Sequence, residues 1–197
     1  MTVYLCIIMR TRDQKKYDTI VKSTIKLTNK LGFSGISISK IAKEANVSPA
    51  TIYIYFENKE DLLTTIYYDI RKKASESVLT NIDANMSIKE QFYAIWGNSF
   101  SFYLNHPEYV QYREQFEQTK MMENIKTDDF ELNKYTIEIL TQGIQNRIIQ
   151  NLPIPLLISF AFIPIITLVR LHFSNVLTMG EKEIMDACNI AWKSIVL

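Results

Sequence analysis

The segment from Ser37 to Phe56 constrains the fold of this chain more than any other stretch. Ser37 is a good helix N-cap. The apolar residues behind it recur at the spacing of one helix face: Ile38, Ile41, Ala42 and Ala45. Asn46 tolerates the left-handed conformation of a tight turn, and Ser48 followed by Pro49 is a strong signal that a second helix begins. The segment therefore predicts two short helices joined by a tight turn.

Helical periodicity continues on both sides of this segment. The residues before it predict a helix over 13–31 that ends at Gly32, because glycine readily takes the positive φ of a helix C-cap. The residues after it predict a longer helix that is capped by Asn58 and runs to about Val78. No Pro-, Gly- or Ser-rich linker follows this helix, so we expect it to join the head stiffly to the rest of the chain.

The composition favours helices in the rest of the chain as well. The 197 residues include only 5 Gly and 5 Pro, and no stretch alternates apolar and polar residues as a strand would. Helical spacing recurs in four further segments: 88–105, 108–123, 128–149 and 181–195. We therefore predict an all-α protein with a three-helix head, residues 9–57, which a helix joins to a helical body, residues 58–197.

An uncharged run over 152–169 is the most apolar part of the body. Its length of about 18 residues reaches the lower edge for a membrane span. Three prolines shorten the regular helix, however, and no second span accompanies it. A membrane-anchored protein is therefore an alternative, which detergent-free solubility would decide, and we expect no membrane partner.

A helix that is apolar on all sides must be covered on all sides. We expect one side of the 152–169 segment to cover the protein's own core and the other to meet a second copy of the chain. The last helix carries one apolar stripe at helical spacing: Ile184, Cys188, Ala191, Trp192 and Ile195. Two such helices from each copy predict a four-helix homodimer interface.

Charge is distributed unevenly along the chain. Residues 1–73 carry 13 Lys and Arg against 7 Asp and Glu, whereas residues 74–197 carry 9 against 14, and the total is +1. A basic head on an acidic body suits a polyanion that binds at one end only.

The residue types needed for most chemistry are missing or isolated. Cys6 and Cys188 form no spacing pattern, which favours a reduced, cytoplasmic protein. His106 and His172 have no Cys, Asp or Glu at ligand spacing, so no metal site is predicted. We find no nucleophile–base pair and no Gly-rich phosphate loop. The sequence therefore predicts a protein that is not an enzyme and needs no cofactor.

The first eight residues are apolar but lack the positive region and the cleavage site of a signal peptide. We expect translation to start at Met9, so that Arg10 and Arg12 belong to a short basic arm. Residues 1–8 are then a non-native or disordered extension.

The motif residues of the head resemble the helix-turn-helix of the tetracycline-repressor (TetR) family. They read Ser37-Ile…Ile41-Ala42…Ala45-Asn-Val47-Ser48…Tyr53-x-Tyr55-Phe56-x-x-Lys59…Leu62. The match is dense from about Lys15 to Leu63 and loose beyond. The chain departs from the family at Asn46, where Gly is usual, at Lys40, where an acidic residue is common, and at Ile54, where a polar residue is common. The resemblance implies an all-helical homodimer with a DNA-binding head and a ligand-binding, dimerising body.

A head of this kind implies roles for its residues on double-stranded DNA. A recognition helix places its first residues at base edges in the major groove, where the methyl groups of Ala50 and Thr51 can meet thymine. Tyr53, Tyr55 and Lys59 are expected on phosphates. The expected DNA-binding set is Ser37, Lys40, Ser48, Pro49, Ala50, Thr51, Tyr53, Tyr55 and Lys59.

Structural roles compete with these functional ones. Ser37 and Ser48 can act as helix caps alone. Tyr53 and Tyr55 can be half-buried packing residues, and Lys59 can be a solvated surface charge.

The body contains aromatic and Met side chains that suit a small apolar or aromatic effector. The candidate ligand-binding residues are Trp96, Phe100, Tyr103, Tyr112, Phe116 and Met121. The competing interpretation is that they are ordinary core. The family implies repression of transcription, a palindromic operator and release by the effector. A body that binds a protein partner instead of a small ligand is the alternative.

Overall fold

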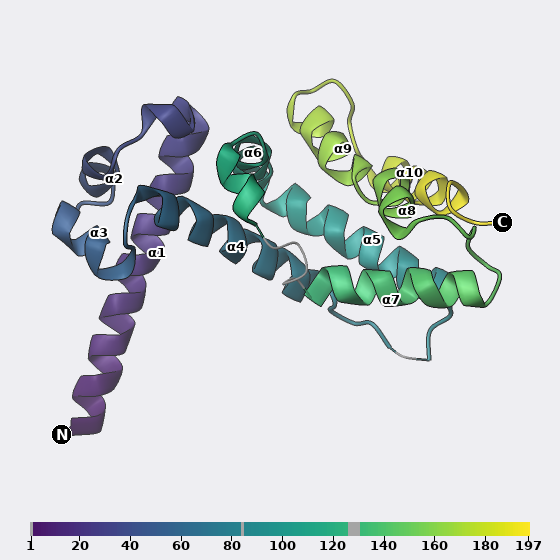
Figure 1. The fold of residues 1–197 in the computed structure, drawn as a ribbon, viewed down its shortest axis with the longest axis horizontal. Coiled ribbons are helices and arrows are strands. Elements are labelled where there is room, and N and C mark those ends of the chain that lie inside the picture. The colour runs from purple at the N-terminus through teal and green to yellow at the C-terminus, as the bar shows by residue number, and fades with distance from the viewer. Residues whose placement is uncertain (1, 84, 126–130) are drawn as a thin grey trace. The chain divides into compact units, whose positions relative to one another are not determined.

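The structure of the chain is a computed structural model that describes residues 2–83, 85–125 and 131–197, with side chains from residue 14 and, after the last gap, from residue 134. Figure 1 labels the α-helices of the structure. The elements are α1 (Thr2–Gly35), α2 (Ile38–Glu44), α3 (Pro49–Tyr55), α4 (Lys59–Val78), α5 (Ile88–Asn105), α6 (Pro107–Glu117), the 3-10 helix η1 (Lys120–Asn124), α7 (Glu131–Gln145), α8 (Ile154–Ala161), α9 (Pro164–Phe173) and α10 (Glu181–Lys193). The described residues contain no strand, and the predicted all-α fold is confirmed.

The chain divides into two compact units. The head unit consists of Met1–Asp69 and Gln111–Ile125, and the body unit consists of Ile70–Val110 and Lys126–Leu197. Helices α4 and α6 therefore each contribute residues to both units. The functional domains predicted over 9–57 and 58–197 stay a proposal, because these units group residues by their contacts and not by what they bind.

Helix ends in the head follow the signals in the sequence. Gly32 has a φ of 72° and interrupts the last turns of α1, and Asn46 has a φ of 53° in the turn between α2 and α3. Asn58 caps α4, since its Oδ1 accepts a hydrogen bond from the backbone N–H of Asp61 at 2.9 Å. Helix α1 extends back to Thr2, so the structure places the residues after Met1 in a helix, where the sequence predicted an extension.

The head core is made by aliphatic and aromatic residues that α1, α2, α3 and α4 each turn inward. Fully or almost fully buried members are Ile20, Ile25, Ile41, Ala42, Ile52, Phe56, Leu62 and Ile66. Helices α2 and α3 have seven residues each, which is too short for stability in isolation. Burial against α1 and α4 therefore holds them in place.

Helix α5 lies at the centre of the body core, where it packs against α7, α9 and α10. Its buried face includes Phe92, Ile95, Trp96 and Phe100. Ser87 begins the helix with a capping box, because its side chain and that of Glu90 each accept a hydrogen bond from the other's backbone N–H. Hydrogen bonding in this box lowers the pKa of the Glu90 carboxyl.

The uncharged run forms two helices, α8 and α9, and presents two different faces. The inner residues, buried in the body core, are Leu157, Ala161, Ile165 and Val169. On the outer side, Phe160 leaves 62% and Ile163 54% of its surface exposed, and Leu156 is also exposed. One side thus covers the protein's own core as expected, whereas the described residues do not cover the other.

The apolar stripe of the last helix is placed differently from the prediction. Cys188, Ala191 and Trp192 are buried against the body core and are not exposed for a partner. The stripe packs internally because α10 lies against α5. The exposed apolar residues of α10 are instead Met185 and Ile190.

By length and composition alone, residues Ile154–Phe173 could cross a membrane, and 22% of the 18-residue apolar window within this stretch is buried inside the structure. This is the one such candidate in the part of the chain that was described. It coincides with α8 and α9, which Pro164 separates by starting a new helix. A core helix of a water-soluble protein passes the same test of length and composition, so this test does not distinguish the two.

Two helices end earlier than predicted, for local reasons. The segment predicted over 108–123 leaves the α-helix at Glu117, because both the backbone N–H and the hydroxyl of Thr119 donate to the carbonyl of Phe116. The segment predicted over 128–149 is helical to Gln145; part of its start lies outside the described residues.

The end of α7 is fixed to the C-terminus. The backbone N–H groups of Ile148 and Ile149 both donate to the carbonyl of Gly143, at 2.9 and 3.1 Å. Residues 148–150, which follow α7, form backbone hydrogen bonds with the C-terminal residues: Gln150 N donates to Ile195 O, and Leu197 N donates to Ile148 O. Ile149 is buried directly over Gly143, so this turn leaves no room for a side chain on the glycine.

We predict that Gly143→Ala destabilises the protein. The added Cβ would collide with Cδ1 of Ile149 and lie 2.8 Å from its Cγ1. Overpacking of this kind costs about 1–3 kcal/mol, more than the gain of about 1 kcal/mol from replacing a helical glycine. Urea unfolding followed by circular dichroism measures the change.

Gly97→Ala is the matched control. Gly97 also lies inside a helix, α5, but apart from its chain neighbours and the backbone of its own helical turns, no described atom lies within 4 Å of the position of its added Cβ. The same substitution there should raise the free energy of unfolding by about 0.5–1 kcal/mol. Equal effects of the two substitutions would contradict the steric argument.

Candidate nucleic-acid interface

Helix α3 is held by its inward side chains and leaves the opposite face open. Ile52 and Phe56 are buried in the head core. Ala50, Tyr53 and Ile54 point away from that core and are exposed. Tyr53 leaves 55% of its surface accessible, so the half-buried alternative applies to Tyr55 and not to Tyr53.

Two serines begin the short helices, as the sequence predicted. Ser37 Oγ accepts a hydrogen bond from the backbone N–H of Lys40 at 3.3 Å, and Ser48 Oγ accepts one from that of Thr51 at 3.1 Å. The hydroxyl of Thr51 also lies 2.9 Å from Ser48 Oγ, within hydrogen-bond distance. The capping role of both serines is therefore observed, and a phosphate contact by them stays a prediction.

Tyr55 lies against a cluster that sequence analysis did not single out. Its ring meets that of Tyr17 at 6.0 Å between centroids, and Tyr17 also stacks on Phe56 at 5.6 Å. The hydroxyl of Tyr17 donates to Asp69 Oδ2 at 2.7 Å. Burial and the neighbouring Asp69 carboxylate raise the pKa of Tyr17 well above its usual range, so the hydroxyl stays a donor. This contact joins α1 to α4 on the side that supports α3.

Two lysines near α2 have partners at the end of α1. Lys40 Nζ donates to the carbonyl of Gly35 at 2.6 Å. Lys59 Nζ donates to the carbonyls of Phe33 and Ile36, both at 2.8 Å. Ammonium groups interact favourably with the free carbonyls at a helix C-terminus. The Lys59 contact was not predictable from sequence spacing, and it gives this residue a structural role besides the phosphate contact predicted for it.

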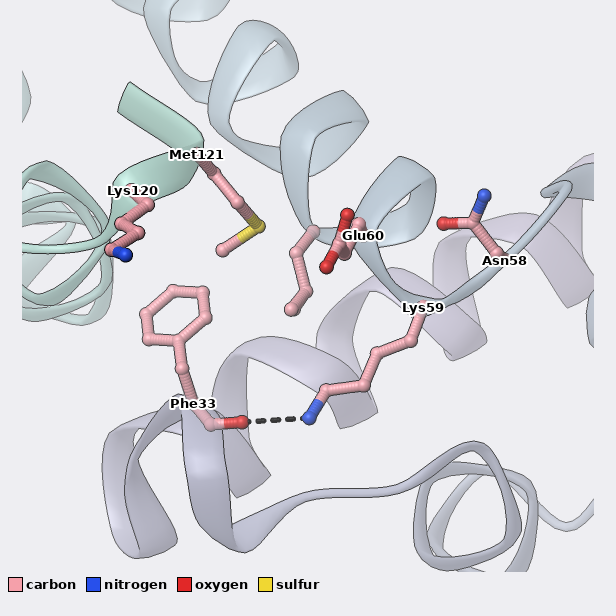
Figure 2. Close-up of a pocket in the computed structure, with 7 residues that line it drawn as sticks. Phe33, Asn58, Lys59, Glu60, Lys120 and Met121 are labelled. Carbon is pink, nitrogen blue, oxygen red and sulfur yellow. Dashed lines mark hydrogen bonds between the residues drawn. The ribbon is translucent and has the colours of Figure 1, made fainter. Parts of the chain in front are cut away.

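The Lys59 contact lies beside an open cavity of about 420 Å³ in the head unit. Figure 2 shows Phe33 and Lys59 on one side of it and Met121 and Lys120, from η1, on another. Leu63 completes an apolar wall with Phe33 and Met121. Met121 thus lines a cavity of the head unit, whereas the sequence predicted that it would line a ligand pocket in the body.

Helix α1 is also joined to α2 by charge. Lys26 Nζ lies 2.6 Å from Glu44 Oε1, and this hydrogen bond lowers the pKa of the Glu44 carboxyl. Because the pair is exposed to solvent, it adds little to the free energy of unfolding, and its main effect is on the orientation of the two helices.

The six aromatic and Met residues predicted to bind a ligand do not form one group. Trp96, Phe100 and Tyr103 lie on α5 in the body unit, whereas Tyr112, Phe116 and Met121 belong to the head unit. The prediction grouped them because helical periodicity identifies an apolar face but not the neighbour that covers it.

The three body residues are part of the packed core. Trp96 leaves 1% of its surface exposed, and its indole N–H donates to the carbonyl of Ala161 at 3.0 Å. Phe100 stacks on Trp96 with ring centroids 5.5 Å apart. Tyr103 is also buried and packs edge-on against Phe102. In this structure these side chains fill space with one another.

Tyr112 and Phe116 fasten α6 to α4 within the head unit. The hydroxyl of Tyr112 donates to the carbonyl of Leu63 at 2.9 Å, and burial raises the pKa of this tyrosine well above its usual value. Phe116 stacks on Tyr67 with ring centroids 4.3 Å apart. Phe33 packs against both rings. These residues hold the head together.

Among the residues described, no group of three or more His, Cys, Asp and Glu side chains could hold a metal ion. Cys188 is buried, and its burial raises the pKa of the thiol to about 12, so it carries no thiolate near neutral pH.

Two family models match the chain. Residues 20–66 match the model described as bacterial regulatory proteins, tetR family, and residues 87–196 match the model described as tetracyclin repressor-like, C-terminal domain. The first covers the helix-turn-helix, and the second covers more than half of the chain.

Relatives and solved structures agree with these matches. A probable HTH-type transcriptional regulator of Bacillus subtilis, YttP, is 31% identical over 144 residues, which are 70% of this chain and 69% of that protein. The crystal structure of a TetR family transcription regulator from Marinobacter aquaeolei VT8 is 29% identical, covers 95% of this chain and 98% of its own, and has a TM-score of 0.86. The transcriptional regulator FadR of Bacillus subtilis, solved in complex with stearoyl-CoA, is 24% identical with a TM-score of 0.71, and the match covers 90% of this chain and 96% of that one.

We predict that Lys59→Met lowers the free energy of unfolding by about 1–3 kcal/mol, because two carbonyls at the end of α1 lose their donor. Lys22→Met, at an exposed lysine of α1, should change it by less than about 0.5 kcal/mol. Thermal and urea unfolding of both variants give the comparison.

The same variant separates the two roles of Lys59. If its ammonium also meets a phosphate, the slope of log affinity for duplex DNA against log salt falls by about one unit. An unchanged slope with reduced stability would leave only the structural role, and unchanged stability would contradict the contact with Phe33 and Ile36.

Proposed function

The chain belongs to the TetR family of transcriptional regulators, and we propose that it is a ligand-responsive repressor that binds a palindromic operator as a homodimer. The observation that carries the DNA-binding part is the open face of α3, whose exposed side chains are held outward by the buried Ile52 and Phe56. A recognition helix anchored in this way can enter a major groove without unfolding any part of the head.

The DNA contacts proposed for the head follow from position and chemistry. Ala50 and Thr51 stand in the first turn of α3, where side chains reach base edges. Tyr53 is exposed and can donate its hydroxyl to a phosphate. Ser37, Lys40, Ser48, Pro49, Tyr55 and Lys59 complete the proposed interface.

The proposed dimer surface is the outer side of α8 and α9 together with the exposed apolar residues of α10. Phe160 and Ile163 are large, apolar and more than half exposed, and Met185 and Ile190 add to this surface within the body unit. Large exposed apolar side chains of this kind are typical of a protein interface. A second copy of the chain is the proposed occupant, since two-fold symmetry matches a palindromic operator.

The proposed effector is a small apolar or aromatic molecule. Two observations support an apolar effector: the aromatic residues on α5, and the stearoyl-CoA in the FadR complex, whose acyl chain is apolar. We propose that such a ligand binds in the body unit by displacing the packed side chains of Trp96, Phe100 and Tyr103, which would then line its pocket. The cavity of the head unit, which Met121 and Phe33 line, is the second proposed place, and Phe33 packs there against Tyr112 and Phe116.

Coupling between effector and operator is proposed to run through α4. This helix is unbroken from Lys59 to Val78, and its residues belong to the head unit up to Asp69 and to the body unit beyond it. A ligand that shifts the body end of α4 therefore also shifts the end that carries the Lys59 contact. Such coupling is typically worth about 1–3 kcal/mol.

We expect the relatives' role as regulators to hold for this chain, which is therefore proposed to be a cytoplasmic protein without catalytic activity. Fractionation without detergent and a screen for hydrolysis of acyl-CoA would test both statements.

Selection of bound duplexes from a random pool tests the function, and Phe160→Asp tests the dimer. Wild-type protein should enrich an approximate palindrome whose half-site centres lie about 34–36 Å apart. Phe160→Asp should shift the protein to a monomer in analytical ultracentrifugation, because a buried carboxylate without a partner is costly, and it should weaken operator binding at least about tenfold.

Gln142→Glu, a charge change at an exposed residue of α7, is the control and should leave both dimer and binding intact. A monomeric wild type, or a wild type that enriches no sequence from the pool, would overturn the proposal.

Stearoyl-CoA, a free fatty acid and an aromatic carboxylate test the effector. An effector should weaken operator binding about 5- to 150-fold. Both tryptophans, Trp96 and Trp192, lie in the body unit, so a change in tryptophan emission would place the ligand there. Ligand binding with unchanged operator affinity would contradict the coupling, and capture of a specific protein by the body, with no small-molecule effect, would favour the alternative of a protein partner.

A further inference from the structure

Folding does not explain the position of Ile54 in the head. It leaves 76% of its surface exposed, although isoleucine is among the residues most often buried. Its neighbours on α3, Ile52 and Phe56, provide the anchoring. Ala50 lies four residues before Ile54 and is also exposed, so the two side chains share one face of the helix. This face presents methyl groups.

The side chains of α3 offer little hydrogen bonding to a base edge. The helix reads Pro-Ala-Thr-Ile-Tyr-Ile-Tyr and has no Arg, Lys, Asn, Gln, Asp or Glu. The hydroxyl of Thr51 is already within hydrogen-bond distance of Ser48 Oγ. The ring of Tyr55 packs against Tyr17. The bidentate pairs that identify guanine or adenine therefore cannot come from this helix.

One kind of direct readout suits the exposed methyl groups of Ala50 and Ile54. In the major groove thymine alone among the four bases presents a methyl group, and apolar side chains recognise it by contact. Building on the proposed DNA binding, we propose that Ile54, with Ala50 one turn before it, reads the 5-methyl groups of pyrimidines in each half-site, and that Ile54 is a specificity-determining residue.

Duplex DNA is the occupant that the charges around this face favour. The head unit carries 12 Lys and Arg against 10 Asp and Glu, and exposed Lys40 and Lys43 lie on the neighbouring α2. Phosphates flank a major groove on both sides, so an apolar strip within a basic head fits a groove floor lined with methyl groups. Thymine and 5-methylcytosine share the recognised group, and the test below distinguishes them.

The test uses the duplex most enriched by the selection. Each thymine of one half-site is replaced in turn by deoxyuridine, which removes the methyl group and keeps the base pairing. At one or two positions the affinity of the wild-type protein should fall about fourfold, the value of one lost methyl contact. Replacement of the same T·A pair by 5-methylcytosine·G should restore most of the affinity relative to unmethylated C·G.

Ile54→Ala is the decisive variant, and its exposure means that folding is unaffected. Ile54→Ala should bind the thymine duplex more weakly than the wild type does. At one position, replacing thymine by deoxyuridine should then no longer lower its affinity, because the side chain and the thymine methyl group form a coupled pair in a double-mutant cycle. Leu31→Ala, an exposed aliphatic residue of α1 in the same unit, is the matched control and should leave both values unchanged.

The outcomes separate this inference from the function on which it rests. Tight binding to a selected duplex with no deoxyuridine penalty at any position would overturn methyl reading and leave DNA binding intact. A penalty that persists in Ile54→Ala would overturn the role of Ile54, and so would unchanged DNA affinity in that variant. Absence of any selected duplex would contradict the proposed function itself.

Discussion

The head depends on how a helix of seven residues is kept in place. Helix α3 cannot be stable alone, so its orientation comes from the buried side chains of Ile52 and Phe56 and from the surfaces that receive them. Tyr17 is central here, because it stacks on Phe56 and donates a hydrogen bond to Asp69. One side chain of α1 thereby supports both the helix proposed to enter DNA and the helix that leads toward the body.

Local signals in the sequence were sufficient to predict the helix-turn-helix. Ser37, Asn46 and Ser48 act through their own backbone or that of residues nearby, so their caps and turn could be read from spacing alone. The contacts that complete the site were not predictable in this way. Lys59 meets a carbonyl 26 residues away, and Tyr17 meets an acid 52 residues away, and no periodicity reports such partners.

The aromatic residues show the same limit in another form. Their spacing correctly predicted apolar helix faces, but it could not show that Tyr112 and Phe116 fasten α6 to the head while Trp96 and Phe100 fill the body core. The same reason explains the stripe of α10, which covers α5 and is not available to a partner. Apolar periodicity identifies the face of a helix that must be buried, whereas only the folded structure shows which element packs against that face.

The separation of inward and outward residues on α3 has an evolutionary consequence. Ile52 and Phe56 maintain the fold, whereas Ala50 and Ile54 take no part in the core. If these outward positions contact DNA as proposed, one copy could, after a gene duplication, acquire different target sites by changing them without losing thermodynamic stability. Regulators built in this way can diverge in the genes that they control while their scaffold stays the same.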